Sequence, residues 1–251
     1  MGYSNENFWN ERLKKSFDLQ GVGNRSFSKR YNQYLYRLQE IATIRLFNKL
    51  GIVIQNKEVI NIASGVGYFD NYFKQLGAAK VVGTDISEYA VSKLKKIYPQ
   101  NQYYQFDISK NLPADLENKK FDIVTAYNVL FHIIEDDAFN QSISNIKKLV
   151  QDDGYIIITD TLGCFTIHFQ KHVKFRSKSF YNKILAEQGL EIVSIRPIYF
   201  LFNRSPSYLL FKNKYFEKFF LKPIFYFDMI ITKFLKYNSN AKLIIIKAKN
   251  Y

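Results

Sequence analysis

The sequence has little cysteine, little proline and no long uncharged apolar run. Cys164 is the single cysteine, so no internal disulfide can form, and we expect a protein of a reducing compartment, the cytoplasm. The first residues show neither the basic nor the apolar region of a secretory signal peptide. The apolar stretch at 216–235 contains several charged residues and Pro223, which excludes a membrane-spanning helix of about 20 apolar residues.

Acidic residues are also outnumbered, since 22 Asp and Glu stand against 36 Lys and Arg and give a net charge of +14. The balance is +5 over residues 1–50, −3 over 51–160 and +12 over 161–251. Basic flanks beside a nearly neutral middle favour an anionic small molecule or an anionic surface as partner. A lysine-rich composition caused by a coding sequence biased toward A and T is the alternative explanation.

Apolar runs and helical periodicity alternate through the middle of the chain. This alternation predicts an α/β fold, in which crossover helices cover both faces of a parallel sheet. Pro99 and Gly189 each mark the end of an expected helix. The expected strands are 59–63, 80–85, 103–107, 121–128, 155–160, 190–195 and 243–248, and the expected helices are 69–76, 88–97, 136–150 and 179–188.

Two segments fall outside this alternation and divide the chain. Residues 1–50 form an expected helical extension, best developed over 31–50, and residues 203–240 form an aromatic, lysine-rich helical insert before the last strand. The core domain then comprises 51–202 and 241–251. For the insert we favour a lid over the active site. A dimer surface, or a basic amphipathic element that rests peripherally on a membrane, is the alternative.

A turn of small residues follows the first expected strand, in the run Asn61-Ile62-Ala63-Ser64-Gly65-Val66-Gly67. Such turns let backbone N–H groups approach a ligand closely. Asp85 ends the second expected strand 18 residues after Gly67, where a carboxylate can accept both hydroxyls of a ribose. Asp107 ends the third expected strand, where it can accept from an adenine amino group. The turn and the two carboxylates predict a nucleotide-type cofactor.

With the fourth motif at 121–132 and the turn at 153–158, this ordered set resembles the class I S-adenosylmethionine-dependent methyltransferases. The resemblance covers roughly residues 55–200 and the final strand. It implies a Rossmann-like sheet of seven strands with an antiparallel last strand, and S-adenosylmethionine as cofactor. The residues implied to bind it are Asn61, Ala63, Ser64, Gly65, Gly67, Asp85, Ile86, Asp107, Ile108 and Asn128, and we add Arg37, which could reach the carboxylate of the cofactor.

Two residues depart from the family's pattern. Asn61 occupies the position of the usual Asp or Glu, and Ala63 that of the first glycine. We expect cofactor binding to survive both changes, because Asn still forms hydrogen bonds and Ala is the smallest replacement for Gly. A nicotinamide dehydrogenase is disfavoured, because Asp70 stands where a full G-x-G-x-x-G would have its last glycine.

Methyl transfer needs an acceptor lone pair aligned with the methyl group, and often a base to remove a proton. The candidate bases are the three histidines, His132, His168 and His172. In an extended run at 172–177, His172, Lys174 and Arg176 share one face, which would suit a phosphate or carboxylate of the acceptor. Tyr127 completes the expected substrate site, and we assign no metal ligands.

We therefore expect an enzyme that methylates an oxygen atom of a small anionic metabolite or sugar derivative. In this it resembles methyltransferases of bacterial glycan and small-metabolite pathways. A nucleic-acid substrate is disfavoured, because the sequence has no Asn/Asp-Pro-Pro-Tyr/Phe motif and no RNA-binding module. An RNA methyltransferase and a non-catalytic cofactor-binding subunit stay open as alternatives. A monomer and a homodimer are both compatible with the sequence.

Overall fold

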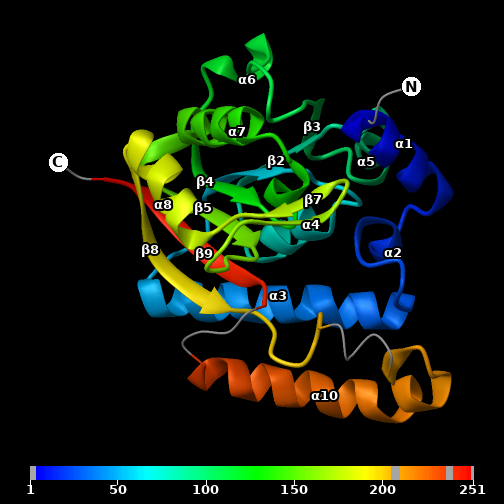
Figure 1. The fold of residues 1–251 in the computed structure, drawn as a ribbon. Helices are drawn as coiled ribbons and strands as arrows, with labels where there is room; N and C mark the ends of the chain where they lie inside the picture. Colours follow the sequence, from blue (N-terminus) through cyan, green and yellow to red (C-terminus); the bar gives the residue numbers. More distant parts are fainter. Residues whose placement is uncertain (1–3, 205–209, 236–239, 250–251) are drawn as a thin grey trace.

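The computed structural model describes residues 4–204, 210–235 and 240–249, which form a seven-stranded sheet, a two-stranded hairpin and flanking helices (Figure 1). The order in the sheet is β3-β2-β1-β4-β5-β9-β8, and β9 runs antiparallel to β5 and β8. The predicted mostly parallel sheet with an antiparallel last strand is confirmed. The strands of the sheet are β1 (Glu58–Ile62), β2 (Lys80–Asp85), β3 (Gln102–Gln105), β4 (Phe121–Ala126), β5 (Val150–Asp160), β8 (Leu190–Pro197) and β9 (Lys242–Ala248).

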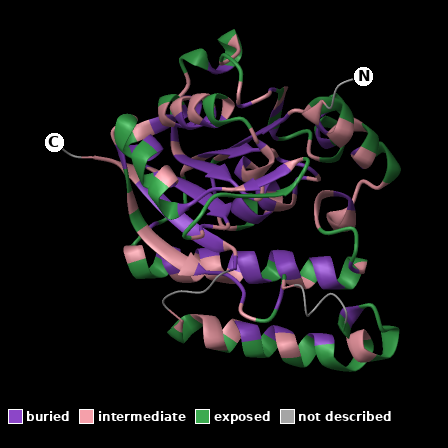
Figure 2. Ribbon diagram, viewed as in Figure 1, coloured by how far each residue is buried: buried purple, intermediate pink, exposed green. Residues whose placement is uncertain are grey.

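Both faces of the sheet are buried, which explains the continuous apolar runs of its strands. Successive side chains of a strand point to opposite faces. Val59 therefore lies in the core shared with α3 and α4, whereas Ile60 lies in the core shared with α7 and α8. Figure 2 shows the strands of the sheet as buried between their flanking helices. The helices around the sheet are α3 (Lys29–Leu50), α4 (Tyr68–Gln75), α5 (Glu88–Ile97), α6 (Ala114–Glu117), α7 (Asp136–Leu149) and α8 (Lys178–Glu187).

Local chemistry sets where these elements begin and end. Ser87 caps α5 by accepting a hydrogen bond from the N–H of Ala90, as its position in the sequence predicts. Two strands, β3 and β4, end two residues before the ends predicted from the sequence. β4 stops at Ala126, because Asn128 adopts a left-handed conformation with a φ of 56°. β3 stops at Gln105, and the carboxylate of Asp107 accepts from the N–H of Ser109 in a turn.

β6 (Ile167–Gln170) and β7 (Val173–Phe175) form a hairpin, of which the sequence analysis considered only the extended run at 172–177. All the side chains of β6 are exposed, so its alternation of apolar and polar residues does not mark a buried face. The hairpin follows β5 and lies in front of the sheet in Figure 1. It thus places the segment 165–176 beside the carboxyl ends of the central strands.

The N-terminal extension forms α1 (Asn5–Lys15) and α2 (Leu19–Val22) before the long helix α3. α1 is tied to the start of α5, because the side-chain oxygen of Asn10 accepts from the hydroxyl of Ser87 and from the N–H of Tyr89. Arg12 joins α1 to α2 by donating to the carbonyl oxygens of Gly21 and Gly23, each at 2.5 Å. The extension therefore covers the carboxyl-end edge of the sheet.

The described part of the insert forms α10 (Lys214–Phe234), which packs on the outer side of α3 (Figure 1). Arg45 of α3 donates to the carbonyl oxygen of Met229 at 2.7 Å, and the buried carboxylate of Asp228 accepts three backbone N–H groups at 200–202. The lid that we expected at 203–240 is therefore not formed by α10, since α3 separates this helix from the sheet. None of the helices within the described residues is long and apolar enough to cross a membrane.

Candidate functional site

The turn after β1 adopts the geometry that its small residues allow. Ala63, Gly65 and Gly67 all have positive φ, at 61°, 57° and 79°. A Cβ at Gly65 would approach Val22 Cγ1 to 2.8 Å, and one at Gly67 would approach Leu94 Cδ2 to 2.7 Å. Gly65 and Gly67 are therefore required by conformation and by space, whereas Ala63 is strained by conformation.

Replacing Ala63 by glycine should stabilise the protein. The left-handed conformation costs a non-glycine residue about 1–2 kcal/mol, and the added freedom of glycine in the unfolded chain offsets about 0.4–1 kcal/mol of that gain. We expect Ala63→Gly to raise the free energy of unfolding by about 0.5–1 kcal/mol, measured by chemical denaturation. Ala90→Gly, inside α5, is the matched control and should lower the free energy of unfolding by about 1 kcal/mol. Equal losses in both variants would contradict the assigned strain.

A buried polar cluster supports the turn from below. Asn61 donates through Nδ2 to the carboxylate of Asp70 at 2.6 Å and accepts from the hydroxyl of Thr125 at 2.8 Å. Ser64 also donates to Asp70, at 3.1 Å. Burial raises the pKa of Asp70 to about 7, although the bonds from Asn61 and Ser64 oppose this shift. Asn61, at the position where the family usually has an acidic residue, is thus hydrogen-bonded to the buried carboxyl group of Asp70 on α4.

Asp85, at the end of β2, is 5% exposed, and both of its oxygens are held by backbone donors. The N–H of Gly65 donates to Oδ2 at 2.7 Å, and the N–H of Ser87 donates to Oδ1 at 2.8 Å. Burial raises the pKa of Asp85 to about 6, against the effect of these two bonds. Each oxygen keeps a second lone pair, so the carboxylate is oriented and can still accept from a ligand.

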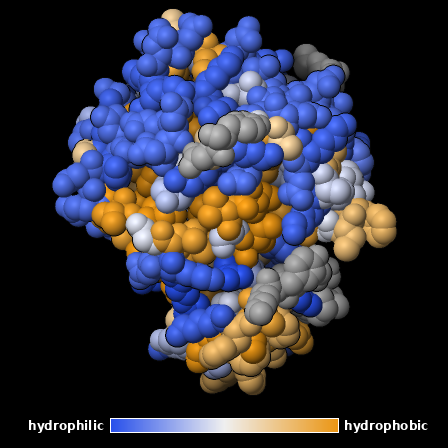
Figure 3. Space-filling model, turned by 90° about the vertical axis from the view of Figure 1, so that its left-hand side faces the viewer, coloured by the Kyte–Doolittle hydropathy of each residue, from blue (hydrophilic) through white to orange (hydrophobic). Residues whose placement is uncertain are grey.

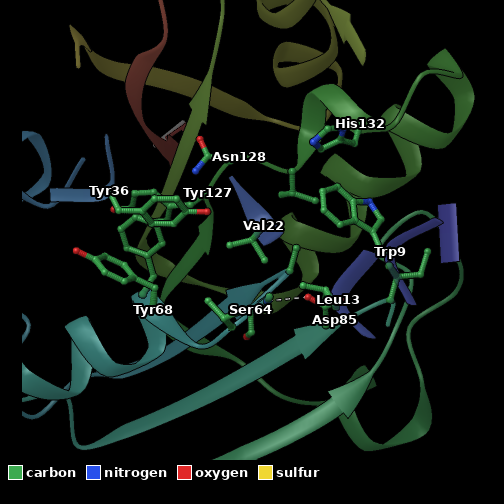
Figure 4. A pocket seen from close by; sticks show the side chains of 16 residues that line it. Trp9, Leu13, Val22, Tyr36, Ser64, Tyr68, Asp85, Tyr127, Asn128 and His132 are labelled. Carbon is green, nitrogen blue, oxygen red and sulfur yellow. Dashed lines mark hydrogen bonds between the residues drawn. The ribbon is translucent and has the colours of Figure 1, made fainter. Parts of the chain in front are cut away.

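Ser64, Gly65 and Asp85 line one wall of a partly open cavity, whose space is about 640 Å³ when the open solvent at its mouth is included. It lies at the carboxyl ends of β1, β2 and β4, where the strand order reverses and α/β proteins bind their ligands. In Figure 4, Trp9 and His132 lie on one side of the cavity, Tyr36, Tyr68 and Tyr127 lie on the other, and Val22 lies between them. The lining residues are Trp9, Leu13, Val22, Tyr36, Ala63–Val66, Tyr68, Phe69, Asp85, Ile86, Tyr127–Val129 and His132.

A second cavity adjoins the first and is bounded by α1, the loop after α2, α3 and the β6–β7 hairpin. Five residues line both, so the two spaces share a wall: Trp9, Val22, Tyr36, Asn128 and His132. Aromatic rings of Phe131, Phe169, Phe175 and Tyr199 line the second cavity, together with Arg12, Arg25 and several uncharged polar side chains. Among the described residues, no aspartate or glutamate lines it. The second cavity therefore combines aromatic and polar walls with the positive charge of two arginines.

His132 lies at the boundary of the two cavities, in the 3₁₀ turn Leu130–His132 after β4. Its Nδ1 is 2.9 Å from the carbonyl oxygen of His172. A carbonyl only accepts, so Nδ1 carries the proton and Nε2 keeps its lone pair. Burial lowers the pKa of His132 to about 4, so the ring is neutral at pH 7. The ring of Trp9 meets it edge-on, with centroids 5.1 Å apart.

The other two histidines differ in their surroundings. His168 lies on the exposed strand β6 and lines neither cavity. His172 lines the second cavity, and its ring is stacked on that of His132 with centroids 5.5 Å apart. Burial lowers the pKa of His172 below its ordinary value. The structure thus brings His132 and His172 together and leaves His168 outside.

Tyr127 and Asn128 both line the first cavity. The hydroxyl of Tyr127 is bonded to that of Thr43 at 2.7 Å, and the ring is stacked on Phe69, so Tyr127 contributes a fixed aromatic wall. Asn128 donates through Nδ2 to the side chain of Gln39 at 3.0 Å. Four residues predicted to bind the cofactor lie outside the cavity lining: Asn61 and Gly67 within the turn, and Asp107 and Ile108 beyond β3.

Arg37 is not brought to the cavity either. Its guanidinium is 62% exposed and paired with Glu40, and the neighbouring Tyr36 is the residue of this helix that lines the cavity. Successive residues of a helix point about 100° apart, so the two side chains take different directions. Arg37 thus forms an ion pair within the helix, and its contact with the cofactor stays a prediction.

Lys174 and Arg176 also lie away from both cavities, which corrects the predicted anion site. In β7 the side chains of Val173 and Phe175 point to the second cavity, and the alternate residues point to α7. Both cations bind Asp136, Lys174 at 2.7 Å and Arg176 at 2.9 Å. Burial of Asp136 raises the pKa of this carboxyl, but the bonds from Lys174 and Arg176 outweigh that effect and hold it below its ordinary value.

Arg176 should therefore matter for stability and not for acceptor binding. Its side chain is 1% exposed, lies 4.1 Å from the ring centroid of Phe139, and donates to the carbonyl oxygens of Ile134 and Glu135. We expect Arg176→Ala to lower the free energy of unfolding by about 3 kcal/mol, because a buried side chain and its bonds are lost together. Lys178→Ala, at an exposed position nearby, should change it by less than about 0.5 kcal/mol. An unchanged melting temperature in Arg176→Ala would contradict this role.

Trp9, Leu13 and Val22 of the N-terminal extension line the first cavity and were not predicted from the sequence. α1 carries few apolar residues, so its inward face does not produce a clear helical stripe. The single tryptophan of the chain was the available indication, because a tryptophan in an otherwise polar helix needs a partner surface. Asp70 was likewise noted only as a departure from a glycine motif.

Comparison with known proteins agrees with this geometry. Residues 60–158 match the family model described as a methyltransferase domain. Among solved structures, magnesium protoporphyrin IX methyltransferase from Synechocystis with bound SAM superposes with a TM-score of 0.57 at 17% identity, over 77% of this chain and 90% of that one. The DhpI–SAH complex superposes with a TM-score of 0.60 at 15% identity, over 98% and 95%. Residues 60–158 thus match a methyltransferase domain, and the chain has the fold of these solved structures. The resemblance predicted from the motifs, and the Rossmann-like fold that it implied, are confirmed.

Curated relatives of this chain match it only in part. Ribosomal protein L11 methyltransferase from Dictyoglomus turgidum is 30% identical over 105 residues, which are 42% of this chain and 33% of that protein. The protein of the same name from Staphylococcus haemolyticus is 34% identical over 149 residues, 57% of this chain and 40% of that protein. The chain thus covers two fifths or less of the length of these relatives.

Proposed function

We propose that this protein transfers the methyl group of S-adenosylmethionine to an oxygen atom of a small anionic acceptor. The residues of the first cavity fit the cofactor. Gly65 brings no side chain into the turn, Asp85 offers oriented acceptors for ribose hydroxyls, and Ile86 and Val129 offer apolar walls. When bound, the cofactor supplies an electrophilic methyl group on a sulfonium. The chain has to hold the acceptor in line with it and to take up the proton.

The lining of the second cavity carries the proposal of an anionic acceptor. Two arginines, Arg12 and Arg25, line it, and no aspartate or glutamate among the described residues does so. Such a lining favours a phosphate or carboxylate, while the aromatic walls favour an apolar or sugar-like body. This cavity takes the place of the anion site that we expected at Lys174 and Arg176. His132 lines both cavities, so its neutral imidazole would adjoin an acceptor bound in the second cavity.

Release of S-adenosylhomocysteine tests the proposal. The purified chain should form this product with phosphate- or carboxylate-bearing metabolites and sugar derivatives, and much more slowly with their neutral analogues. Binding of S-adenosylmethionine without turnover on any acceptor would favour the non-catalytic subunit. Turnover only on neutral compounds would overturn the anionic acceptor.

A protein acceptor is the second candidate, because the curated relatives are named for the methylation of ribosomal protein L11. The same assay with ribosomal protein L11 and with RNA as acceptors separates these cases. RNA turnover would bring strong dependence on salt, because phosphate contacts release counterions. The cytoplasmic location stays a prediction based on the single cysteine, and the oligomeric state stays open.

A further inference from the structure

The outer face of α10 is apolar and exposed. This helix buries Leu221, Phe225 and Asp228 against the protein and turns its opposite face outward (Figure 2). Figure 3 shows apolar side chains gathered over α10 at the foot of the molecule. Their exposed fractions range from 46% to 78%. The exposed large apolar and aromatic residues of the helix are Tyr215, Phe219, Phe220, Tyr226, Phe227, Ile230 and Phe234.

The spacing of these residues makes one continuous stripe. Phe219, Pro223, Tyr226, Ile230 and Phe234 follow each other at intervals of three or four residues, the spacing that places side chains on one side of a helix. At about 1.5 Å per residue the stripe is roughly 22 Å long. It is too long and too regular to be a scatter of single exposed hydrophobic residues.

The charges beside the stripe have one sign. Lys214, Lys218, Lys222 and Lys233 are exposed, and Lys218 and Lys222 lie close to aromatic rings of the stripe, with Nζ 5.9 Å and 6.0 Å from the ring centroids. The two carboxylates of the helix are used within the protein. Glu217 accepts from the hydroxyl of Ser28, and Asp228 is buried against backbone N–H groups. The exposed surface of α10 thus combines an aromatic stripe with uncompensated positive charge.

We propose that this face of α10 docks onto the headgroup region of a bilayer that contains anionic phospholipid. A helix of this kind lies in the plane of the interface, with its aromatic side chains inserted and its lysines bound to phosphates. A second copy of the chain fits less well, because two such faces would bring their lysines together with no exposed carboxylate on either helix to pair with them. The proposal is independent of the methyl-transfer activity.

Vesicle co-sedimentation of the full chain tests the surface. The protein should bind vesicles of phosphatidylcholine mixed with phosphatidylglycerol, bind vesicles of phosphatidylcholine alone much more weakly, and be released by high salt. The triple variant Lys218→Gln, Lys222→Gln, Lys233→Gln should bind about 100-fold more weakly at low salt, since each lysine near an anionic surface contributes about fivefold. The triple variant Phe219→Ser, Ile230→Ser, Phe234→Ser should lose binding.

The matched control replaces three exposed lysines elsewhere, Lys95, Lys96 and Lys110, by glutamine. It changes the net charge equally and should leave vesicle binding within about twofold of the parent. Equal loss in this control, or no binding of the parent to anionic vesicles, would overturn the docking face. Sedimentation equilibrium tests whether a second copy of the chain binds the stripe instead. A dimer that disappears in the serine variant would assign the stripe to a second copy.

Discussion

His132→Gln should lower kcat by about 100-fold or more while the affinity for S-adenosylmethionine stays nearly unchanged. The imidazole lies at the wall between the two cavities, with Nδ1 bonded to a carbonyl and Nε2 free to accept a proton from the acceptor's hydroxyl. Glutamine keeps a hydrogen-bonding side chain but cannot take up that proton. Steady-state release of S-adenosylhomocysteine, together with calorimetric cofactor binding, measures the two effects separately.

His168→Gln is the matched control, because His168 lies on the exposed strand β6 and should leave kcat unchanged. The pH profile adds a second criterion. Since the pKa of His132 is about 4, the base is deprotonated throughout the neutral range, and turnover through it should fall only as the pH approaches that value. Equal kcat values for the two variants would show that another group, or water, accepts the proton.

Asp85→Ala should weaken the binding of S-adenosylmethionine by about 100-fold. A charged carboxylate contributes about 1.5–3 kcal/mol for each hydrogen bond, and Asp85 is placed to accept from two ribose hydroxyls. The substitution also removes the acceptor for the N–H of Gly65, so the turn loses part of its support. Isothermal calorimetry gives the affinity, and thermal melting shows whether the variant is folded.

Asp107→Ala tests whether the second carboxylate predicted from the motifs contributes to cofactor binding as Asp85 does. Asp107 accepts only from Ser109 among the described contacts and lies outside the cavity lining, so its loss should change the cofactor affinity by less than about threefold. Wild-type affinity in Asp85→Ala would refute the ribose role. An effect of Asp107→Ala as large as that of Asp85→Ala would place the adenine nearer to β3 than the cavity suggests.

Much of the core was predictable because its apolar runs are long and its helix boundaries are chemically marked. The helix at 88–97 was predicted with its Ser87 cap, since a serine before a periodic run specifies a helix start. The hairpin at 167–175 was not predicted as a unit, because its strands are only four and three residues long and β6 has no buried face. The position of α10 could not be predicted, because the composition of a segment indicates that its helix has an apolar face and does not show which surface covers that face.

The site was predictable as far as backbone geometry determines it. Gly65 and Asp85 follow from the need for a tight turn and an oriented carboxylate at neighbouring strand ends. Side-chain partnerships across the fold were not predictable. Two examples are the hydrogen bond between Asn61 and Asp70 and the ion pair of Arg176 with Asp136. Both depend on distances between elements, which no local sequence pattern encodes.

The place of β9 in the sheet has a consequence for how the protein is made. This strand, at 242–248, lies between β5 and β8 and separates them. β8 therefore has no neighbour in the sheet while the ribosome is still adding the residues that follow it. The nascent chain can form β1 to β5, but β8 and the apolar side chains that pack on β9 stay without their partner until residue 248 has been synthesised and has emerged. A pause in translation within 200–240 would leave this unfinished edge open to aggregation.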